Sequence, residues 1–334
     1  MPHVARPSSH ARTRIVDPGL LMVALMWGVG NVVFKWILLV FDPAAFLALR
    51  MSIMSVVMIA WLLLSGPRRR LPTRDALIVT VLGGGLIAAW VLSYASAMKM
   101  TTASEGTLLI STAPVWTALI AAILGMELVT GLNWLGIAVA LGGVAMVVFL
   151  APGEAVPRAP ERLLGDLLMI AAAWMYGGYM VISKRWMQRF GELPVICRTY
   201  AGSGVLLAAV GAPRLLDADW AAITPGHWVG AAYVTLLAGA VATVMWYRAI
   251  ARTSASGTAV YHYLVPGVAV ICAAIFLGET LAALQVVGFA VTLVGVYLAR
   301  VPPPPAAAGA KERPTRQLAA KLCEFLQSRR RSDK

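Results

Sequence analysis

Residues 101–148 read TTASEGTLLISTAPVWTALIAAILGMELVTGLNWLGIAVALGGVAMVV, and residues 253–300 read TSASGTAVYHYLVPGVAVICAAIFLGETLAALQVVGFAVTLVGVYLAR. The second stretch aligns with the first without a gap, and 15 of the 48 aligned residues are identical. Biased composition readily aligns Ala, Val and Leu, but not a proline, a glutamate and two glycines at fixed spacing. These matches are Pro114 with Pro266, Glu127 with Glu279, Gly136 with Gly288 and Gly143 with Gly295. The chain therefore contains an internal repeat, which sets its architecture.

The repeat extends over half of the protein. Residues 20–24 read LLMVA and precede Trp27 by three positions, and residues 167–171 read LLMIA and precede Trp174 by the same spacing. Each copy ends in an apolar helix broken by proline, a short turn carrying glutamate, and a Gly-containing apolar helix. The repeat units are therefore residues 19–150 and 165–300.

The composition indicates a membrane protein. Hydrophobic residues make up 60% of the chain and charged residues 13%, against roughly 45–50% and about 25% in soluble domains. Ten apolar stretches approach the ~20 residues that a helix needs to cross a bilayer. They are residues 20–40, 43–64, 76–97, 106–124, 132–150, 167–183, 194–212, 228–247, 258–277 and 282–300. The predicted fold class is an all-α polytopic membrane protein with ten transmembrane helices.

Each half has five predicted spans, an odd number, so the second half enters the membrane from the opposite face. Two inverted-topology five-helix repeats are typical of secondary transporters, with a solute site near the midplane between them. Around the repeats we expect a cytoplasmic basic segment (1–18), an outer linker (151–164) and a cytoplasmic tail (301–334). Within the tail, a Pro-rich spacer precedes a basic amphipathic pattern. The tail either contacts anionic lipids of the inner leaflet or is a basic extension that only enforces topology.

The net charge of +13 reports topology rather than a nucleic-acid partner. With the amino terminus in the cytoplasm, 21 of the 28 Lys and Arg residues fall in inner segments and four in outer loops. This is the positive-inside distribution. It predicts that both termini lie in the cytoplasm.

Two prolines and two glutamates recur in both copies. Pro114 and Pro266 lie at mid-membrane, where a proline frees backbone carbonyls; each either lines a cavity or is a structural kink. Glu127 and Glu279 lie in helix connections on opposite faces, where a carboxylate satisfies free amides at the start of the next helix. We therefore interpret both glutamates as structural caps.

Three cations lie within predicted spans. Lys35 and Arg50 fall in the outer half of adjacent helices, and each either faces a solute cavity or snorkels to the surface. Arg198 lies one turn from the cytoplasmic end, where snorkelling is favoured. Because no carboxylate falls deep within a span, the cavity favours an anionic or zwitterionic solute.

Further candidates are polar or aromatic. His262, one turn before Pro266, is either a hydrogen-bonded core residue or a site for protons or solute. Asn31 shares the first helix with Trp27. Aromatic side chains either stack on a solute or pack in the core and interfacial belts. The aromatic candidates for the cavity are Trp27, Trp90, Tyr94, Trp174, Tyr179 and Trp246.

No chemistry-bearing motif points to an enzyme. Three cysteines at unrelated spacing, Cys197, Cys272 and Cys323, form neither a disulfide framework nor a metal site. A phosphate-binding loop or a nucleophile with its base is not recognisable either. We therefore expect no cofactor, no metal and no catalytic residue.

These marks together resemble the EamA family of the drug/metabolite transporter superfamily. In the first half they are Trp27-Gly28, Phe34-Lys35, Pro43, Arg50, Ala97, residues 102–104, Pro114, Glu127, Gly136 and Gly143. In the second half they are Gly165-Asp166, Trp174, Ala249, residues 254–256, Pro266, Glu279, Gly288 and Gly295. The resemblance covers residues 19–300. It implies ten helices in two inverted repeats, a central cavity, and transport of small metabolites across a bacterial plasma membrane, often outward.

The sequence thus predicts a secondary transporter, an exporter of amino-acid-like or organic-anion solutes that works by alternating access. The second half has Ile182 where the first has Lys35, so the halves are not expected to contribute equally to binding. Two alternatives stay open. One is a membrane-embedded lipid-processing enzyme, and the other is a non-transporting membrane scaffold that acts through its basic tail.

Overall fold

The protein is a bundle of apolar helices. The computed structural model describes residues 17–65, 71–124, 130–150, 160–252 and 255–299, and these residues contain no strand. The first half contains α1 (Pro18–Leu38), α2 (Pro43–Leu64), α3 (Thr73–Ile78), η1 (Val79–Gly83), α4 (Gly84–Met100), α5 (Ala103–Ile110), α6 (Ala113–Ile123), α7 (Gly131–Ala145) and η2 (Met146–Leu150). The second half contains α8 (Pro160–Phe190), α9 (Glu192–Leu216), η3 (Trp220–Ala222), α10 (Pro225–Ala232), η4 (Tyr233–Val241), α11 (Ala242–Arg252), α12 (Ala255–Leu277) and α13 (Ala283–Ala299).

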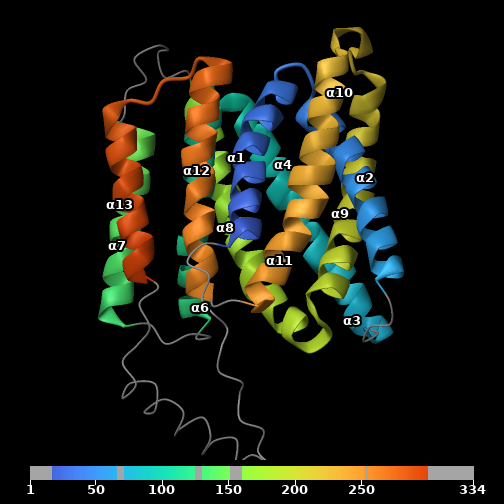
Figure 1. Ribbon diagram of the computed structural model, residues 1–334, viewed down its shortest axis with the longest axis horizontal. Coiled ribbons are helices and arrows are strands. Elements are labelled where there is room, and N and C mark those ends of the chain that lie inside the picture. Colours follow the sequence, from blue (N-terminus) through green and yellow to red (C-terminus); the bar gives the residue numbers. More distant parts are fainter. Residues whose placement is uncertain (1–16, 66–70, 125–129, 151–159, 253–254, 300–334) are drawn as a thin grey trace, which may run out of the picture.

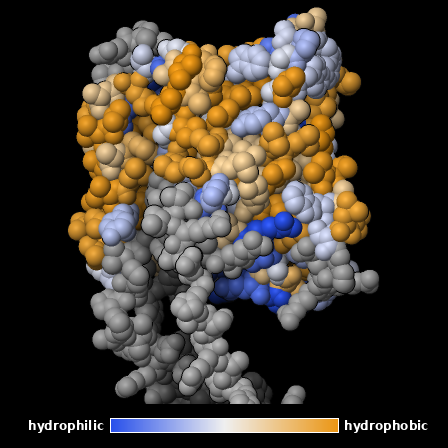
Figure 2. All heavy atoms as spheres, in the orientation of Figure 1, coloured by the Kyte–Doolittle hydropathy of each residue, from blue (hydrophilic) through white to orange (hydrophobic). Residues whose placement is uncertain are grey.

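The helices lie side by side (Figure 1), and the chain is a multi-pass membrane protein. Within the part of the chain that the structure describes, eight helical stretches are long and apolar enough to cross a bilayer, and the shorter apolar helices Leu264–Leu277 and Ala283–Ala299 add to them. Apolar side chains cover the flank of the bundle (Figure 2). Exposed Leu63, Val205 and Ile275 are among them. Such a surface is suited to lipid rather than to water.

Local sequence sets where the helices begin. The Asp17 carboxylate accepts hydrogen bonds from the amides of Gly19 and Leu20 at the start of α1. Asp42 does the same for Ala44 and Ala45 at the start of α2. In both cases a proline occupies the first helical turn, where its missing N–H costs nothing.

The two repeated prolines do not act alike. In the first copy the chain breaks between Ile110 and Ala113, and Pro114 lies in the first turn of α6. In the second copy α12 runs through Pro266 as one helix, so the prediction of a break there is wrong. At the first break, Ser111 donates to the Thr107 carbonyl and Thr112 to the Leu109 carbonyl. The aligned residues 263 and 264 are Tyr and Leu, which lack a short hydroxyl for this purpose.

Close helix contacts depend on small residues. The most extensive contacts join α2 with α9, α7 with α13, α4 with α8 and α1 with α12. Between α7 and α13, a Cβ on Gly143 would lie 2.5 Å from the Gly288 carbonyl oxygen, and one on Gly295 would overlap the Ala140 backbone. Backbones can approach this closely only where a side chain is absent, as is common between membrane helices.

Candidate functional site

A cavity of about 170 Å³ lies within the bundle. Single buried waters need only about 10–15 Å³ by a comparable measure, so the cavity has room for a small solute. Tyr176 contributes to it from near the middle of the 31-residue α8. Of the twelve predicted cavity residues, six line it: Trp27, Asn31, Arg50, Trp90, Tyr94 and Trp246.

Arg50 brings a positive charge to the cavity. Its Nη2 lies 3.4 Å from the Val234 carbonyl oxygen, and its guanidinium carbon lies 5.3 Å from the centre of the Phe34 ring. Its Nε atom is buried and has no hydrogen-bond partner among the residues that the structure describes. The lining residues that the structure describes include no Asp or Glu. The cavity therefore holds a cation with an unused donor and without a lining carboxylate.

A second unused donor belongs to Trp90. Its indole Nε1 is buried without a hydrogen-bond partner in the described ranges of the chain, and its ring lies against that of Tyr176 with centroids 4.5 Å apart. Buried polar groups in proteins are almost always hydrogen-bonded, so an unpaired one calls for an explanation. Two such donors border the same cavity.

Two polar side chains of α1 that line the cavity, Trp27 and Asn31, already have partners. Tyr94 donates its hydroxyl to Asn31 Oδ1 at 3.0 Å, and Trp27 donates Nε1 to the Ala238 carbonyl at 2.9 Å. The Trp27 ring also packs against Trp246, with centroids 5.2 Å apart. These contacts fix the orientation of the aromatic walls.

Lys35 does not line the cavity. Its Nζ donates to the carbonyl oxygens of Met98, Lys99 and Thr101 at 2.8, 3.1 and 2.7 Å. The side chain thereby caps the carboxyl end of α4, where the unpaired carbonyls and the helix dipole favour a cation. This structural contact matches neither interpretation offered for Lys35, a residue that faces the solute cavity or a cation that snorkels to the surface.

Other predicted residues also lie elsewhere. Trp174 is 52% exposed, because two positions along α8 turn it by about 200° from Tyr176, which faces the cavity. Tyr179 is buried in the core without lining the cavity. Pro114 and Pro266 do not line the cavity, although their sequence neighbours Ala113 and Val265 do.

Some predictions fall outside what the structure describes. This applies to the side chain of His262, to Glu127 and to the tail 301–334. Arg198 is half-buried near the start of α9 and does not line the cavity.

Glu279 is a cap, but of a different helix from the one expected. Its carboxylate accepts from the amides of Ala103 and Ser104 at 2.7 and 2.9 Å, at the start of α5. The next helix, α13, begins only at Ala283. The expectation that Glu279 serves its own following helix is therefore wrong.

Several lining residues carried no distinctive signal in the sequence. Tyr200 of α9 and Thr243 of α11 each share an apolar helix with other hydroxyl residues, and Ser111 marks the break before α6. Val234 and Gly239 line the cavity from the wide π-helical turns of η4. Such turns occur often at functional sites, but the amino-acid composition does not predict them.

Comparison with known proteins agrees with this architecture. The sequence matches the EamA-like transporter family twice, over residues 15–149 and 163–301. A probable terminal-alkyne amino-acid exporter of Streptantibioticus cattleyicolor is 30% identical over 253 residues, which cover 75% of this chain and 82% of that protein. An uncharacterized transporter of Archaeoglobus fulgidus is 25% identical, over 84% of this chain and 95% of that protein.

The fold also has a solved counterpart. A protein crystal structure with 21% sequence identity superposes with a TM-score of 0.59, over 84% of this chain and 95% of the other. A likeness at this identity concerns the fold alone. The family match, in contrast, covers both halves of the sequence. This chain belongs to the EamA-like transporter family.

Proposed function

We propose that the protein is a secondary transporter that exports small carboxylate-bearing solutes, amino-acid-like or organic-anion, across the bacterial inner membrane. The observation that carries the proposal is the pair of unused buried donors, Arg50 Nε and Trp90 Nε1, that border one cavity. Leaving a buried donor unpaired costs about 1–3 kcal/mol. A carboxylate in the cavity would accept from both donors and neutralise the guanidinium.

The walls favour a solute with an apolar portion beside its carboxylate. The rings of Trp27, Trp246, Tyr176 and Trp90 border the same space as Arg50. Binding pockets commonly combine apolar walls with a few polar groups that fix orientation. The relative in Streptantibioticus, described as a probable amino-acid exporter, supports the same solute class.

Alternating access is proposed on the basis of the repeat. The two halves share a sequence pattern, and each matches the family separately. The packing is consistent with related halves: α1 packs on α12, and α8 packs on α5 and α6, which correspond to α12 in the repeat. Two inverted repeats rocking about a midplane cavity would expose it to each face in turn. The distribution of Lys and Arg supports a cytoplasmic location for both termini.

The test is transport by purified protein in proteoliposomes. Uptake of a panel of radiolabelled amino acids and small organic anions would be measured with and without a pH gradient, and with unlabelled solute preloaded. We expect saturable uptake of one carboxylate class, and loss of that uptake in Arg50→Gln. Arg214→Gln, which removes an exposed arginine of α9, is the matched control and should transport normally. Uptake that prefers cations, or that is unchanged in Arg50→Gln, would overturn the solute assignment.

A further inference from the structure

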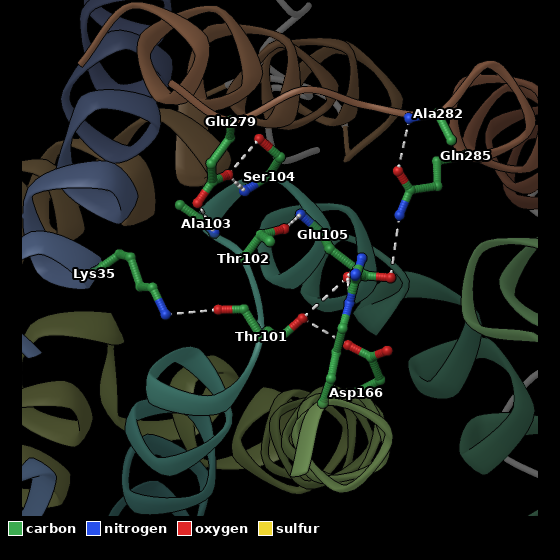
Figure 3. Close-up of polar contacts among 11 residues, drawn as sticks. Lys35, Thr101, Thr102, Ala103, Ser104, Glu105, Asp166, Glu279, Ala282 and Gln285 are labelled. Atoms are coloured by element: carbon green, nitrogen blue, oxygen red, sulfur yellow. Dashed lines mark hydrogen bonds and ion pairs between the residues drawn. The ribbon is translucent and has the colours of Figure 1, made fainter. Parts of the chain in front are cut away.

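The turn between α4 and α5 is held by side chains from the other half of the chain (Figure 3). This turn, Thr101–Glu105, lies at the end of the bundle where α12 joins α13, the upper end in Figure 1. Four residues of α8, the α12–α13 connection and α13 contact it. We call these four residues the clamp: Arg162, Asp166, Glu279 and Gln285.

Glu279 holds the first turn of α5. Its Oε1 accepts from the Ala103 amide at 2.7 Å, and its Oε2 accepts from the Ser104 amide at 2.9 Å and the Ser104 hydroxyl at 2.8 Å. Amides at a helix start lack partners within the helix, and the dipole there favours a negative charge. A carboxylate from a distant segment therefore replaces a local cap.

The remaining clamp residues act on Thr101 and Glu105. Arg162 donates to Glu105 Oε2 from Nε at 2.8 Å and from Nη2 at 2.5 Å. Gln285 donates to Glu105 Oε1 at 3.2 Å, and Thr101 donates its hydroxyl to Asp166 at 2.7 Å. Glu105 is only 2% exposed, so this carboxylate depends on its partners for charge compensation.

The clamp lies just beyond the cavity. On α4 the cavity ends at Tyr94, seven residues before Thr101, and on α5 it begins at Ile110, six residues after Ser104. At 1.5 Å per residue these separations are about 9–10.5 Å along the helices. The clamp therefore joins the two halves of the chain at one end of the cavity, about two helical turns from its lining.

We infer that the clamp is a gate that keeps this end of the cavity closed, and that its contacts break each time the cavity opens there. The inference rests on the proposed alternating-access transport. The clamp residues contact the turn through hydrogen bonds and the Arg162–Glu105 ion pair, beside small apolar contacts such as that of Ala103 with Ala269 and Ala273 of α12. Water that enters on opening can solvate every one of these groups, so part of the free energy lost with each bond is recovered. Polar contacts of this kind suit a seal that must open and close repeatedly.

The experiment measures access to the cavity from one side of the membrane and needs no solute. In a variant whose three native cysteines are replaced by alanine, Ser111→Cys places a thiol in the cavity lining. Sealed vesicles would be treated with a membrane-impermeant maleimide on the face that carries the clamp. We expect Glu279→Ala to raise the labelling rate at least about threefold, because both amides of α5 lose their acceptor. The labelling rate of Glu279→Gln, which keeps one carbonyl oxygen, should lie between the rates of the parent and of Glu279→Ala.

The matched control is Asp42→Ala. Asp42 also accepts from two backbone amides at a helix start, at the same end of the bundle, but within its own half. A general loosening would raise labelling in both variants, whereas opening of a gate raises it only in Glu279→Ala. Labelling by a permeant maleimide, and a single peak in size-exclusion chromatography, would establish that each variant is folded and each thiol reactive.

Two results would overturn the inference. One is labelling of Glu279→Ala at the parent rate, and the other is an equal increase in Asp42→Ala. Ser104→Ala, which removes only the hydroxyl bond, provides a milder variant if Glu279→Ala does not fold, and it should give a smaller increase. If the protein takes up none of the radiolabelled solutes, the proposed function is contradicted. The labelling result can still be interpreted, because it needs no solute.

Discussion

Lys35 donates a hydrogen bond from Nζ to the backbone carbonyl of Thr101 at 2.7 Å, and so ties the end of α1 to the turn after α4. The same ammonium reaches the carbonyls of Met98 and Lys99. A lysine has three donors and no acceptor, so all three are used on carbonyls that the helix itself leaves unpaired. Lys35, in the first half of the chain, thus stabilises the same turn that Glu279 of the second half holds.

Replacing Lys35 by methionine should destabilise the protein. The substitution keeps the length of the side chain but leaves three carbonyl groups without their donor, at a cost of about 3 kcal/mol. Thermal unfolding of the purified protein in detergent should shift down by several degrees. Lys99→Met, at an exposed position in the last turn of α4, is the control and should unfold like the parent. An unchanged transition in Lys35→Met would mean that these bonds contribute nothing.

Arg50 should be sensitive even to a conservative change. Lysine keeps the charge but lacks the planar fork that holds a carboxylate with two bonds. We therefore expect Arg50→Lys to raise KM for the transported solute about tenfold, which corresponds to about 1.4 kcal/mol. The measurement is initial uptake in proteoliposomes against solute concentration. Equal KM values in the parent and in Arg50→Lys would argue against a bidentate contact.

Trp90→Phe tests the second unused donor. The substitution keeps an aromatic ring beside Tyr176 but removes the indole N–H. Since a hydrogen bond to a charged group contributes about 1.5–3 kcal/mol, KM for a carboxylate solute should rise about tenfold while folding is retained. Trp134→Phe, at a lipid-facing tryptophan that is 49% exposed, should leave KM unchanged. If both variants behave alike, the Trp90 N–H is not a solute ligand.

Two adjacent glycines of α7 should respond in opposite ways. A Cβ on Gly143 would lie 2.5 Å from the Gly288 carbonyl oxygen and would overlap the Thr292 side chain, whereas one on Gly142 meets no atom within 4 Å. We expect Gly143→Ala to cost about 1–3 kcal/mol through overpacking and to lower the unfolding temperature. Gly142→Ala should be neutral or slightly stabilising, because alanine favours helix. Similar thermal unfolding of the two variants would contradict this packing of α7 against α13.

The candidate site was partly predictable because expensive residues are conspicuous in apolar helices. Arg50 is conspicuous as a cation within a predicted span, and Trp27, Trp90 and Trp246 are conspicuous as aromatic residues of predicted spans. Lys35 stood out in the same way, yet it binds backbone carbonyls instead of lining the cavity. The two cations lie in adjacent helices, each in the half next to the α1–α2 connection. They differ in how each helix is rotated about its axis and in which segments pack against it. Hydropathy predicts neither property.

The sequence by itself determined the helical membrane architecture, the internal repeat and the family, because apolar length and motif spacing are local properties of the chain. The tertiary structure alone decided which side chains share the cavity and what the polar residues contact. Glu279 shows the reason: its partners Ala103 and Ser104 precede it by 176 and 175 positions. A carboxylate at the end of a helix predicts that some amide will be capped. Which amide it caps depends on how distant helices pack, and that is settled only when the whole bundle forms.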